Sequence, residues 1–247
     1  MLRVCADPNN LPFSNDREQG FENAIARIVA GELNRRVEYH WQPQRRGFVR
    51  TTLNAGWCDV VVGVPAHYEL VATTRPYYRS TYVFVSRRGA GTRPTSLDDP
   101  RLRTMRIGVE MTGEDGDNPP AVQALASRHL VDNMRGYLVY GDYSMPDPPR
   151  RVIDAVANGE VETSIAWGPL AGYFARQSSA EPLVITPVRS EADGRGVTFT
   201  FDIAMGVRRR DETLRTALDS ALLRRASEIR RVLREFGVPL LPLGGAS

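Results

Sequence analysis

Aromatic, arginine and acidic side chains are concentrated between two strand-like runs in the first third of the chain. The runs cover residues 59–63 and 80–85, and both are rich in β-branched residues. Polar groups at the carboxyl ends of parallel strands commonly line a ligand cleft, and arginine with tyrosine also favours contact with a protein partner. Packing at a sheet edge is the structural alternative. The candidate residues here are Tyr68, Glu69, Arg75, Tyr77, Tyr78 and Arg79.

Two further groups of candidate residues also follow strand-like runs. The first comes after residues 2–6, where side-chain hydrogen bonds within a turn are the alternative to lining a cleft; it comprises Asp7, Asn9, Asn10 and Phe13. The second belongs to the second half of the chain, where we expect about half of the side chains to be core. It comprises Glu110, Tyr140, Asp142, Tyr143, Trp167 and Tyr173.

Metal binding and catalysis receive little support from these residue types. Residues 110–117 are acid-rich, but their spacing does not match an EF-hand loop, and Asp117 could instead cap a helix. The chain contains no nucleophile elbow, zinc-protease motif or P-loop. We therefore predict no metal, no cofactor and no enzymatic activity. Glu69 or Glu110 in a dry cleft could act as a general acid, which keeps an enzyme as an alternative.

The two cysteines, Cys5 and Cys58, lie in or beside strand-like runs and have no partner for a zinc site. One interpretation is that both cysteines are buried free thiols. If the two strands are neighbours, a disulfide is equally reachable and would indicate an oxidising compartment. We predict the Cys5–Cys58 disulfide as the outcome to test.

Periodicity predicts two successive β-α-β series, which is the pattern of parallel sheets with right-handed crossovers. In the first series we expect strands at 2–6, 36–41 and 59–63, with helices at 21–34 and just before 54–56. The second series has a short helical segment at 96–103, strands at 106–110, 136–140, 161–166 and 183–186, and helices that begin near 119, 149 and 169.

Two crossing strands are expected to join these halves. The outgoing strand covers residues 80–87, and the returning strand covers 197–207. Residues 211–236 are expected to be helical, and these C-terminal helices must pack back on the first half. We therefore predict a discontinuous lobe 1 and an inserted lobe 2, with a cleft that a hinge can close. Lobe 1 comprises residues 1–86 and 200–247, and lobe 2 comprises residues 87–199.

The composition is that of a globular protein, with 42% apolar and 25% charged residues and a net charge of +3 over 247 residues. No apolar run reaches the roughly 18 residues that a membrane span needs. All 32 basic residues are arginine, and the runs near residues 208 and 224 have acids beside them, which favours solvated helices over nucleic-acid binding. We expect either a cytosolic protein or a mature secreted chain whose signal peptide is absent.

This arrangement resembles the type II periplasmic solute-binding fold of family 3 over the whole chain. The segments that carry the resemblance are GWCDVVVG at 56–63, TRPYY at 74–78, RIGV at 106–109 and NGEVETSI at 158–165. The resemblance implies an α/β protein with two β-α-β lobes, joined by a two-strand hinge with a cleft between them.

A narrower resemblance connects the chain with the MoxJ/XoxJ-type binding proteins encoded beside quinoprotein methanol and alcohol dehydrogenases. It is carried by VCADPNNLPFSN, WQPQRRGFVRTTLNAG, CDVVVGVP, TTRPYYRSTYVFV, NPPAVQALA, VYGDY and AWGPLAGYFA. It implies a periplasmic protein that helps to mature or activate a pyrroloquinoline-quinone (PQQ)-dependent dehydrogenase, which would be its partner, together with a possible small-molecule or peptide ligand.

The chain departs from the amino-acid-binding members of the family at both ends of their ligand clamp. Those members carry Thr and Arg after the third strand, whereas residues 64–69 here read VPAHYE. They also place an Asp at the end of a late strand of the second lobe, where this chain has Trp167. A free amino acid is therefore not the expected ligand. A receptor for another small polar solute and a cyclohexadienyl-dehydratase-like enzyme are the alternatives to the accessory role.

Overall fold

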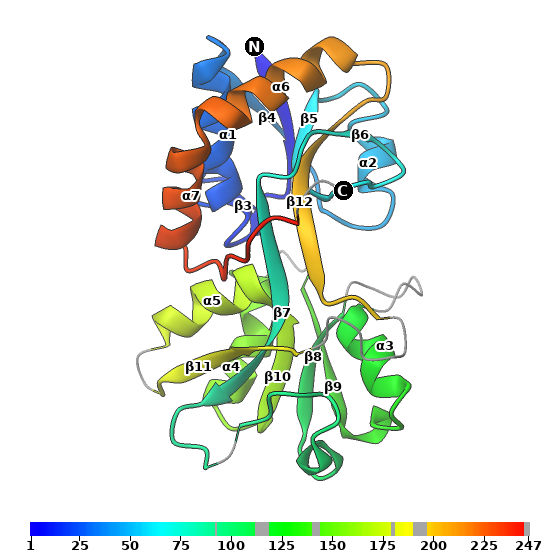
Figure 1. Cartoon of the computed structure of the whole chain (residues 1–247), viewed down its shortest axis with the longest axis vertical. Coiled ribbons are helices and arrows are strands. Elements are labelled where there is room, and N and C mark those ends of the chain that lie inside the picture. The colour runs from blue at the N-terminus through cyan, green and yellow to red at the C-terminus, as the bar shows by residue number, and fades with distance from the viewer. Residues whose placement is uncertain (92, 112–118, 140–143, 179–180, 190–196, 245–247) are drawn as a thin grey trace. The chain divides into compact units, whose positions relative to one another are not determined.

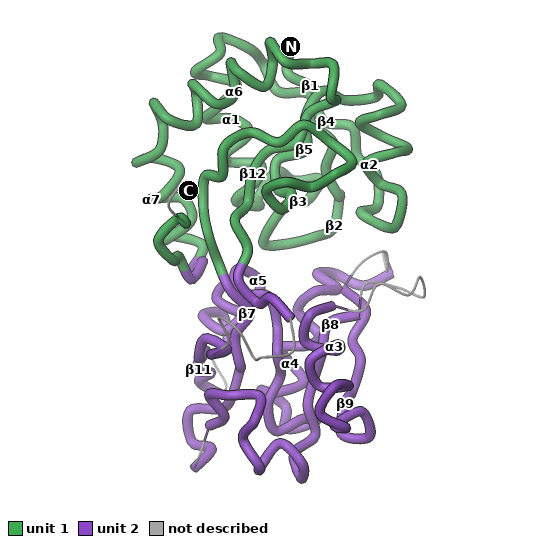
Figure 2. Tube along the Cα trace, turned by 45° about the vertical axis from the view of Figure 1, so that its right-hand side comes forward, with its two compact units in different colours: residues 1–80, 201–236, 240–247 green, residues 81–200, 237–239 purple. Residues whose placement is uncertain are grey.

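The computed structural model describes residues 1–91, 93–111, 119–139, 144–178, 181–189 and 197–244 (Figure 1). The chain forms two compact units (Figure 2). Unit 1 comprises residues 1–80, 201–236 and 240–247, and unit 2 comprises residues 81–200 and 237–239. The lobe boundaries expected from the sequence, at 86/87 and 199/200, stay a prediction.

The sheet of unit 1 is built around β1 (Leu2–Ala6), which lies between β4 (Val37–Trp41) and β5 (Val60–Pro65) and is parallel to both. Strand β12 (Thr200–Val207) pairs antiparallel with β5, and the short β6 (Ala72–Thr73) pairs with β12. The first strand of the β-α-β series is thus the central one, as right-handed crossovers in both directions allow.

The sheet of unit 2 repeats this order. Strand β8 (Ile107–Met111) lies between β9 (Met134–Leu138) and β10 (Thr163–Trp167), again in parallel. Strands β7 (Tyr78–Arg87) and β11 (Leu183–Pro187) complete it, because β7 pairs antiparallel with both β10 and β11. The predicted α/β architecture of two β-α-β halves is therefore confirmed.

The two crossing strands expected from the sequence are β7 and β12. Strand β7 begins in unit 1 and ends in unit 2, and β12 runs in the other direction. Just before β12, the backbone carbonyl of Phe199 accepts hydrogen bonds from two residues of β7, the amide of Tyr82 at 2.9 Å and the hydroxyl of Thr81 at 3.1 Å. The returning segment is regular only from Thr200, three residues later than expected.

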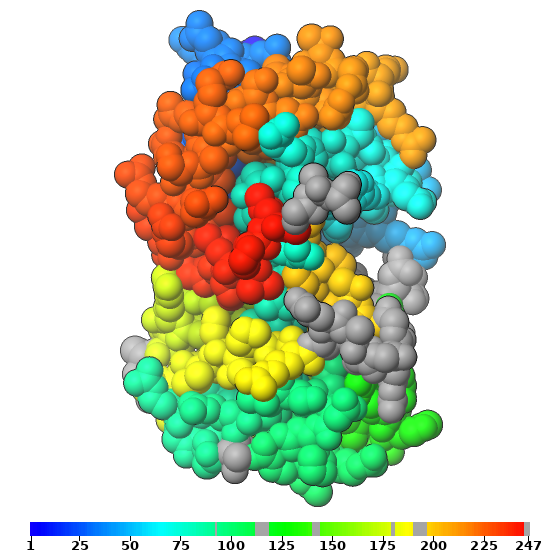
Figure 3. All heavy atoms as spheres, in the orientation of Figure 1, coloured from blue at the N-terminus to red at the C-terminus, as the bar shows by residue number. Residues whose placement is uncertain are grey.

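In unit 1, α1 (Phe21–Glu32) and α7 (Ala226–Glu235) lie on one side of the sheet and α2 (Phe48–Thr51) on the other (Figure 1). Side chains of α6 (Glu212–Arg224) and α7 form an outer surface of this unit (Figure 3). The remaining elements of unit 1 are the short strands β2 (Asn9–Asn10) and β3 (Ser14–Asn15).

The segment expected to be helical, residues 211–236, forms two helices, because α6 ends at Arg224 and α7 begins at Ala226. No glycine or proline marks this break in the sequence. Arg225 leaves the helical conformation, and its carbonyl accepts hydrogen bonds from the amides of Glu228 and Ile229. Its side chain and that of Arg224 reach Glu32 on α1, so tertiary contacts accompany the break.

In unit 2, a core of Leu102, Ile107, Val109, Leu125 and Ile165 lies between the sheet and its helices. The strand expected at 136–140 begins two residues earlier, and the strand expected at 161–166 begins two residues later. The helices are α3 (Pro120–Ala126), α4 (Arg151–Ala157) and α5 (Gly168–Gln177), with 3-10 turns at Pro100–Arg103, Val131–Asn133 and Pro148–Arg150.

Strands β1 and β5 are joined by covalent and ionic links. Cys5 on β1 and Cys58 just before β5 form the predicted disulfide, with their Cα atoms 5.5 Å apart. The carboxylate of Asp59 accepts hydrogen bonds from the side chains of Arg3 and Arg208. Burial opposes ionisation of Asp59, but these bonds outweigh it and lower its pKa to about 2. The carboxylate thus ties β1, β5 and the end of β12 together.

Candidate ligand and partner site

Asp7, the first polar residue after β1, is buried and holds its own loop. Its Oδ1 accepts the amide of Asn9 at 2.8 Å, which is the turn-forming bond that the sequence offered as an alternative. Its Oδ2 accepts the amide of Gln44 at 2.7 Å, and the Gln44 side chain accepts from Asn10. These contacts give Asp7 and Asn10 a structural role, and a ligand role for Asp7, Asn9 and Asn10 stays a prediction.

An aromatic cluster stands beside this loop. Phe13 contacts Phe21 edge-on, with ring centroids 5.3 Å apart, and Phe21 contacts Tyr78 at 6.2 Å. Tyr77 packs against Tyr78 at 5.1 Å and donates its hydroxyl to the carbonyl of Val62 at 3.0 Å. Three predicted site residues, Phe13, Tyr77 and Tyr78, therefore belong to one cluster, which also includes a core residue of α1.

Glu22, which sequence reasoning missed, lies in the first turn of α1 and is partly buried. Its Oε1 lies against Gly63 of β5, so close that a Cβ at that glycine would be 2.0 Å from the oxygen. Within the described part of the chain, its carboxyl has no hydrogen bond and no ion pair. Burial raises the pKa of Glu22 to about 8, so the group is mostly neutral at pH 7.

Nothing in the sequence pattern marked Glu22 as unusual. An acidic residue in the first turn of an amphipathic helix normally complements the helix dipole at the surface. The signal that could have identified Glu22 is the glycine of the third strand, Gly63, because a residue without a side chain leaves room for a carboxyl group beside it. This proximity becomes visible only once the helix is placed on the sheet.

The other residues of the predicted arginine and tyrosine group are held by separate partners. Arg75 donates its amide to Asp219 of α6 at 2.6 Å, and Arg79 lies 3.6 Å from Asp202. The carbonyl of Glu69 accepts from Arg209, while Tyr68 packs on the core beside the disulfide. Arg75 and Glu69 form these bonds through backbone atoms, so the four residues have separate partners, whereas Tyr77 and Tyr78 contact each other.

In unit 2, Glu110 at the end of β8 lies against the start of α5. The amide of Trp167 donates to its Oε1 at 2.9 Å, and no described residue bonds Oε2. Glu110 is 6% exposed, and its burial raises the pKa to about 7, opposed in part by the Trp167 amide. Tyr82 packs against the indole of Trp167, with ring centroids 5.3 Å apart.

The remaining predicted residues of unit 2 add little to this group. Tyr173 on α5 contacts Phe174 edge-on at 5.0 Å, a packing role. Tyr140, Asp142 and Tyr143 lie outside the described residues. In the described ranges, no three His, Cys, Asp or Glu side chains are grouped so that they could hold a metal ion, and no helix there is long and apolar enough to cross a membrane.

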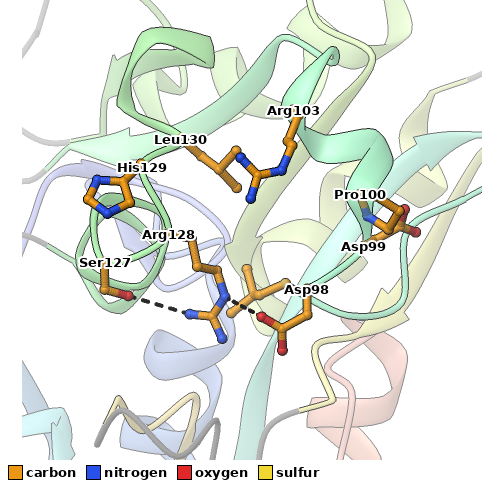
Figure 4. A pocket seen from close by; sticks show the side chains of 9 residues that line it. Asp98, Asp99, Pro100, Arg103, Ser127, Arg128, His129 and Leu130 are labelled. Carbon is orange, nitrogen blue, oxygen red and sulfur yellow. Dashed lines mark hydrogen bonds and ion pairs between the residues drawn. The ribbon is translucent and has the colours of Figure 1, made fainter.

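A separate hollow of about 330 Å³ lies in unit 2 beside the turns that precede β8 and β9 (Figure 4). Its buried Arg128 donates to Asp98 at 2.9 Å and to the carbonyl of Ala124 at 3.1 Å. The hollow is therefore at the amino ends of these strands. Glu110 and Trp167, in contrast, mark the carboxyl ends, where ligands of α/β proteins bind.

In chemical terms, both units present a buried carboxyl group and aromatic rings at the carboxyl ends of parallel strands. A neutral carboxylic acid can donate one hydrogen bond and accept others, and aromatic rings offer apolar contact. The arrangement suits binding of polar, largely uncharged groups or of a protein segment.

The family model for bacterial extracellular solute-binding proteins, family 3, matches residues 2–235, so the chain belongs to that family. The fold is the type II periplasmic binding protein fold. Members of this family are binding proteins.

Individual relatives are similar over almost the whole chain. The protein MoxJ of Methylorubrum extorquens is 36% identical over 251 residues, which cover 98% of this chain and 82% of the relative. The crystal structure of MxaJ from Methlophaga aminisulfidivorans MPT has a TM-score of 0.85 at 27% identity, covering 98% of this chain and all of that one. The periplasmic binding protein XoxJ from Methylobacterium extorquens AM1 has a TM-score of 0.79 at 36% identity, with the same coverage.

Proposed function

We propose that this chain is a periplasmic accessory protein of a PQQ-dependent (quinoprotein) methanol or alcohol dehydrogenase, and that it binds or activates the enzyme without catalysing a reaction itself. The observation that carries the proposal is the similarity to MoxJ, MxaJ and XoxJ along the whole chain. The resemblance to MoxJ/XoxJ-type binding proteins implies an association with such a dehydrogenase instead of a transporter. A disulfide between Cys5 and Cys58 fits an oxidising compartment such as the periplasm.

The polar groups at the strand ends also support a role other than amino-acid capture. A zwitterionic ligand needs a fixed cation and a fixed anion, but the guanidinium groups of Arg75 and Arg79 lie 3.9 and 3.6 Å from the carboxylates of Asp219 and Asp202. The two buried carboxyls, Glu22 and Glu110, are held largely or partly neutral at pH 7 by burial. The two arginines therefore have carboxylate partners within the protein, and the two glutamates are largely or partly uncharged.

A deletion of the gene is expected to abolish most methanol- or alcohol-dependent dehydrogenase activity while the dehydrogenase polypeptide is still exported. Supplying this chain with a secretion signal should restore the activity. The measurement is dye-linked activity in periplasmic extracts, normalised to the dehydrogenase band, with added PQQ as a control for cofactor supply. Normal activity in the deletion strain would count against the accessory role.

A further inference from the structure

The outer edge of β4 in unit 1 is not paired with another strand in the part of the chain that the structure describes. Strand β4 pairs on one side only, with β1, and ends the order β4-β1-β5-β12. Five residues at about 3.3 Å each give this edge a length of roughly 17 Å. An open strand edge offers backbone donors and acceptors to a partner unless the surrounding side chains prevent it.

An exposed aromatic pair lies on the sheet face beside this edge. The indole of Trp57 is 61% exposed and stacks on His40 of β4, with ring centroids 5.5 Å apart and an interplanar angle of 10°. Gln42, which follows β4, donates to the hydroxyl of Thr51 at 2.7 Å, so the exposed side of α2 with Arg50 adjoins the same face. Tryptophan and arginine are the residue types most enriched at the energetic centres of protein interfaces.

The charge of this region is one-sided. Residues 35–51 contain five arginines and one acid, Glu38, although the whole chain is nearly balanced with 32 basic and 29 acidic residues. Arg35, Arg36 and Arg50 are exposed, and none of them forms an ion pair with another described residue. In the C-terminal helical region several arginines have acidic partners, since Arg215 pairs with Glu212 and Arg225 with Glu228.

We propose that the β4 edge surface, defined by Arg35, Arg36, His40, Arg50 and Trp57, is the docking site for an acidic surface of a protein partner. The inference rests on the proposed function, which makes the dehydrogenase that partner. The exposed indole would supply apolar contact, and the arginines would bind carboxylates through two parallel hydrogen bonds. Among the described residues, Arg35, Arg36 and Arg50 have no ion-pair partner, which favours their contact with carboxylates of another protein.

Binding of this chain to its purified dehydrogenase, measured by biolayer interferometry, tests the site. Trp57→Ala and Arg50→Glu should each raise the Kd about tenfold or more, and the wild-type Kd should rise several-fold from 50 to 300 mM NaCl. Leu223→Ala on α6 and Arg230→Glu on α7 are matched controls, since both residues are exposed and lie on other elements. They should leave the Kd within twofold.

The outcomes separate the two proposals. If the wild-type chain binds and the Trp57 and Arg50 variants bind equally well, the docking site is refuted and the accessory role stands. If the wild-type chain does not bind the dehydrogenase, the accessory role itself fails. Binding to vesicles of phosphatidylglycerol that is lost in Arg50→Glu, without binding to the dehydrogenase, would overturn the protein partner and identify an anionic membrane surface. Far-ultraviolet circular dichroism confirms that each variant is folded.

Discussion

Replacing Cys5 and Cys58 together with alanine is expected to lower the free energy of unfolding by about 4 kcal/mol. The bridge joins residues separated by 53 positions, so it removes a large amount of conformational freedom from the unfolded chain. It also fixes β1 to the residues just before β5 at the centre of the unit 1 sheet. Both cysteines are buried, and alanine avoids placing a hydroxyl in that core.

The measurement is urea-induced unfolding followed by circular dichroism at neutral pH. The control is the wild-type chain reduced with dithiothreitol, which keeps both sulfur atoms and should lose a similar amount of stability. If the oxidised and reduced wild-type chains unfold at the same urea concentration, or if native protein shows two reactive thiols, the disulfide does not form or does not constrain the chain.

A Glu22→Gln variant is expected to be more stable than the wild-type chain at alkaline pH, by about 5 kcal/mol above pH 8. Burial raises the pKa of Glu22 from 4.5 to about 8 in the folded chain. Between these values the unfolded chain has released a proton that the folded chain still holds. The wild-type chain therefore loses stability as the pH rises through this range, whereas the amide does not titrate.

The free energies of unfolding of both chains at pH 4.5, 6 and 8.5 test this expectation. The difference should be small at pH 4.5, grow with pH and level off above about 8. Glu69→Gln is the matched control, because Glu69 is exposed. A difference independent of pH, or one that favours the wild-type chain at pH 8.5, would show that Glu22 is charged or paired in the folded protein.

The fold was predictable because its signals are local and repeat in both halves. Alternating or continuous apolar runs marked β1, β5 and β10, and helical spacing marked α1. The disulfide was one of two outcomes that the sequence allowed, and the adjacency of β1 and β5 decided between them. The position at which the C-terminal helical segment divides, Arg225, was not predictable, since the contacts that accompany it are ion pairs of Arg224 and Arg225 with Glu32 on a distant helix.

The candidate site was less predictable because residue type does not reveal how a side chain is used. Asp7, Arg75 and Arg79 had the chemistry of ligand contacts, but each is engaged by a neighbour that is distant in sequence. Glu22 had the appearance of a surface residue, and only its position against Gly63 shows a buried carboxyl. Glu110 was identified because it ends a strand, and there local pattern and tertiary position agree.

The most direct test of the central claim is equilibrium binding between this chain and the purified dehydrogenase of the same organism. The accessory role predicts saturable binding with a Kd in the micromolar range or tighter, which corresponds to about −8 kcal/mol or a more favourable free energy. It also predicts no strong stabilisation by free solutes. The account would be contradicted by absence of binding at tens of micromolar together with a small polar solute that, at 100 times its Kd, stabilises the chain by about 2.7 kcal/mol.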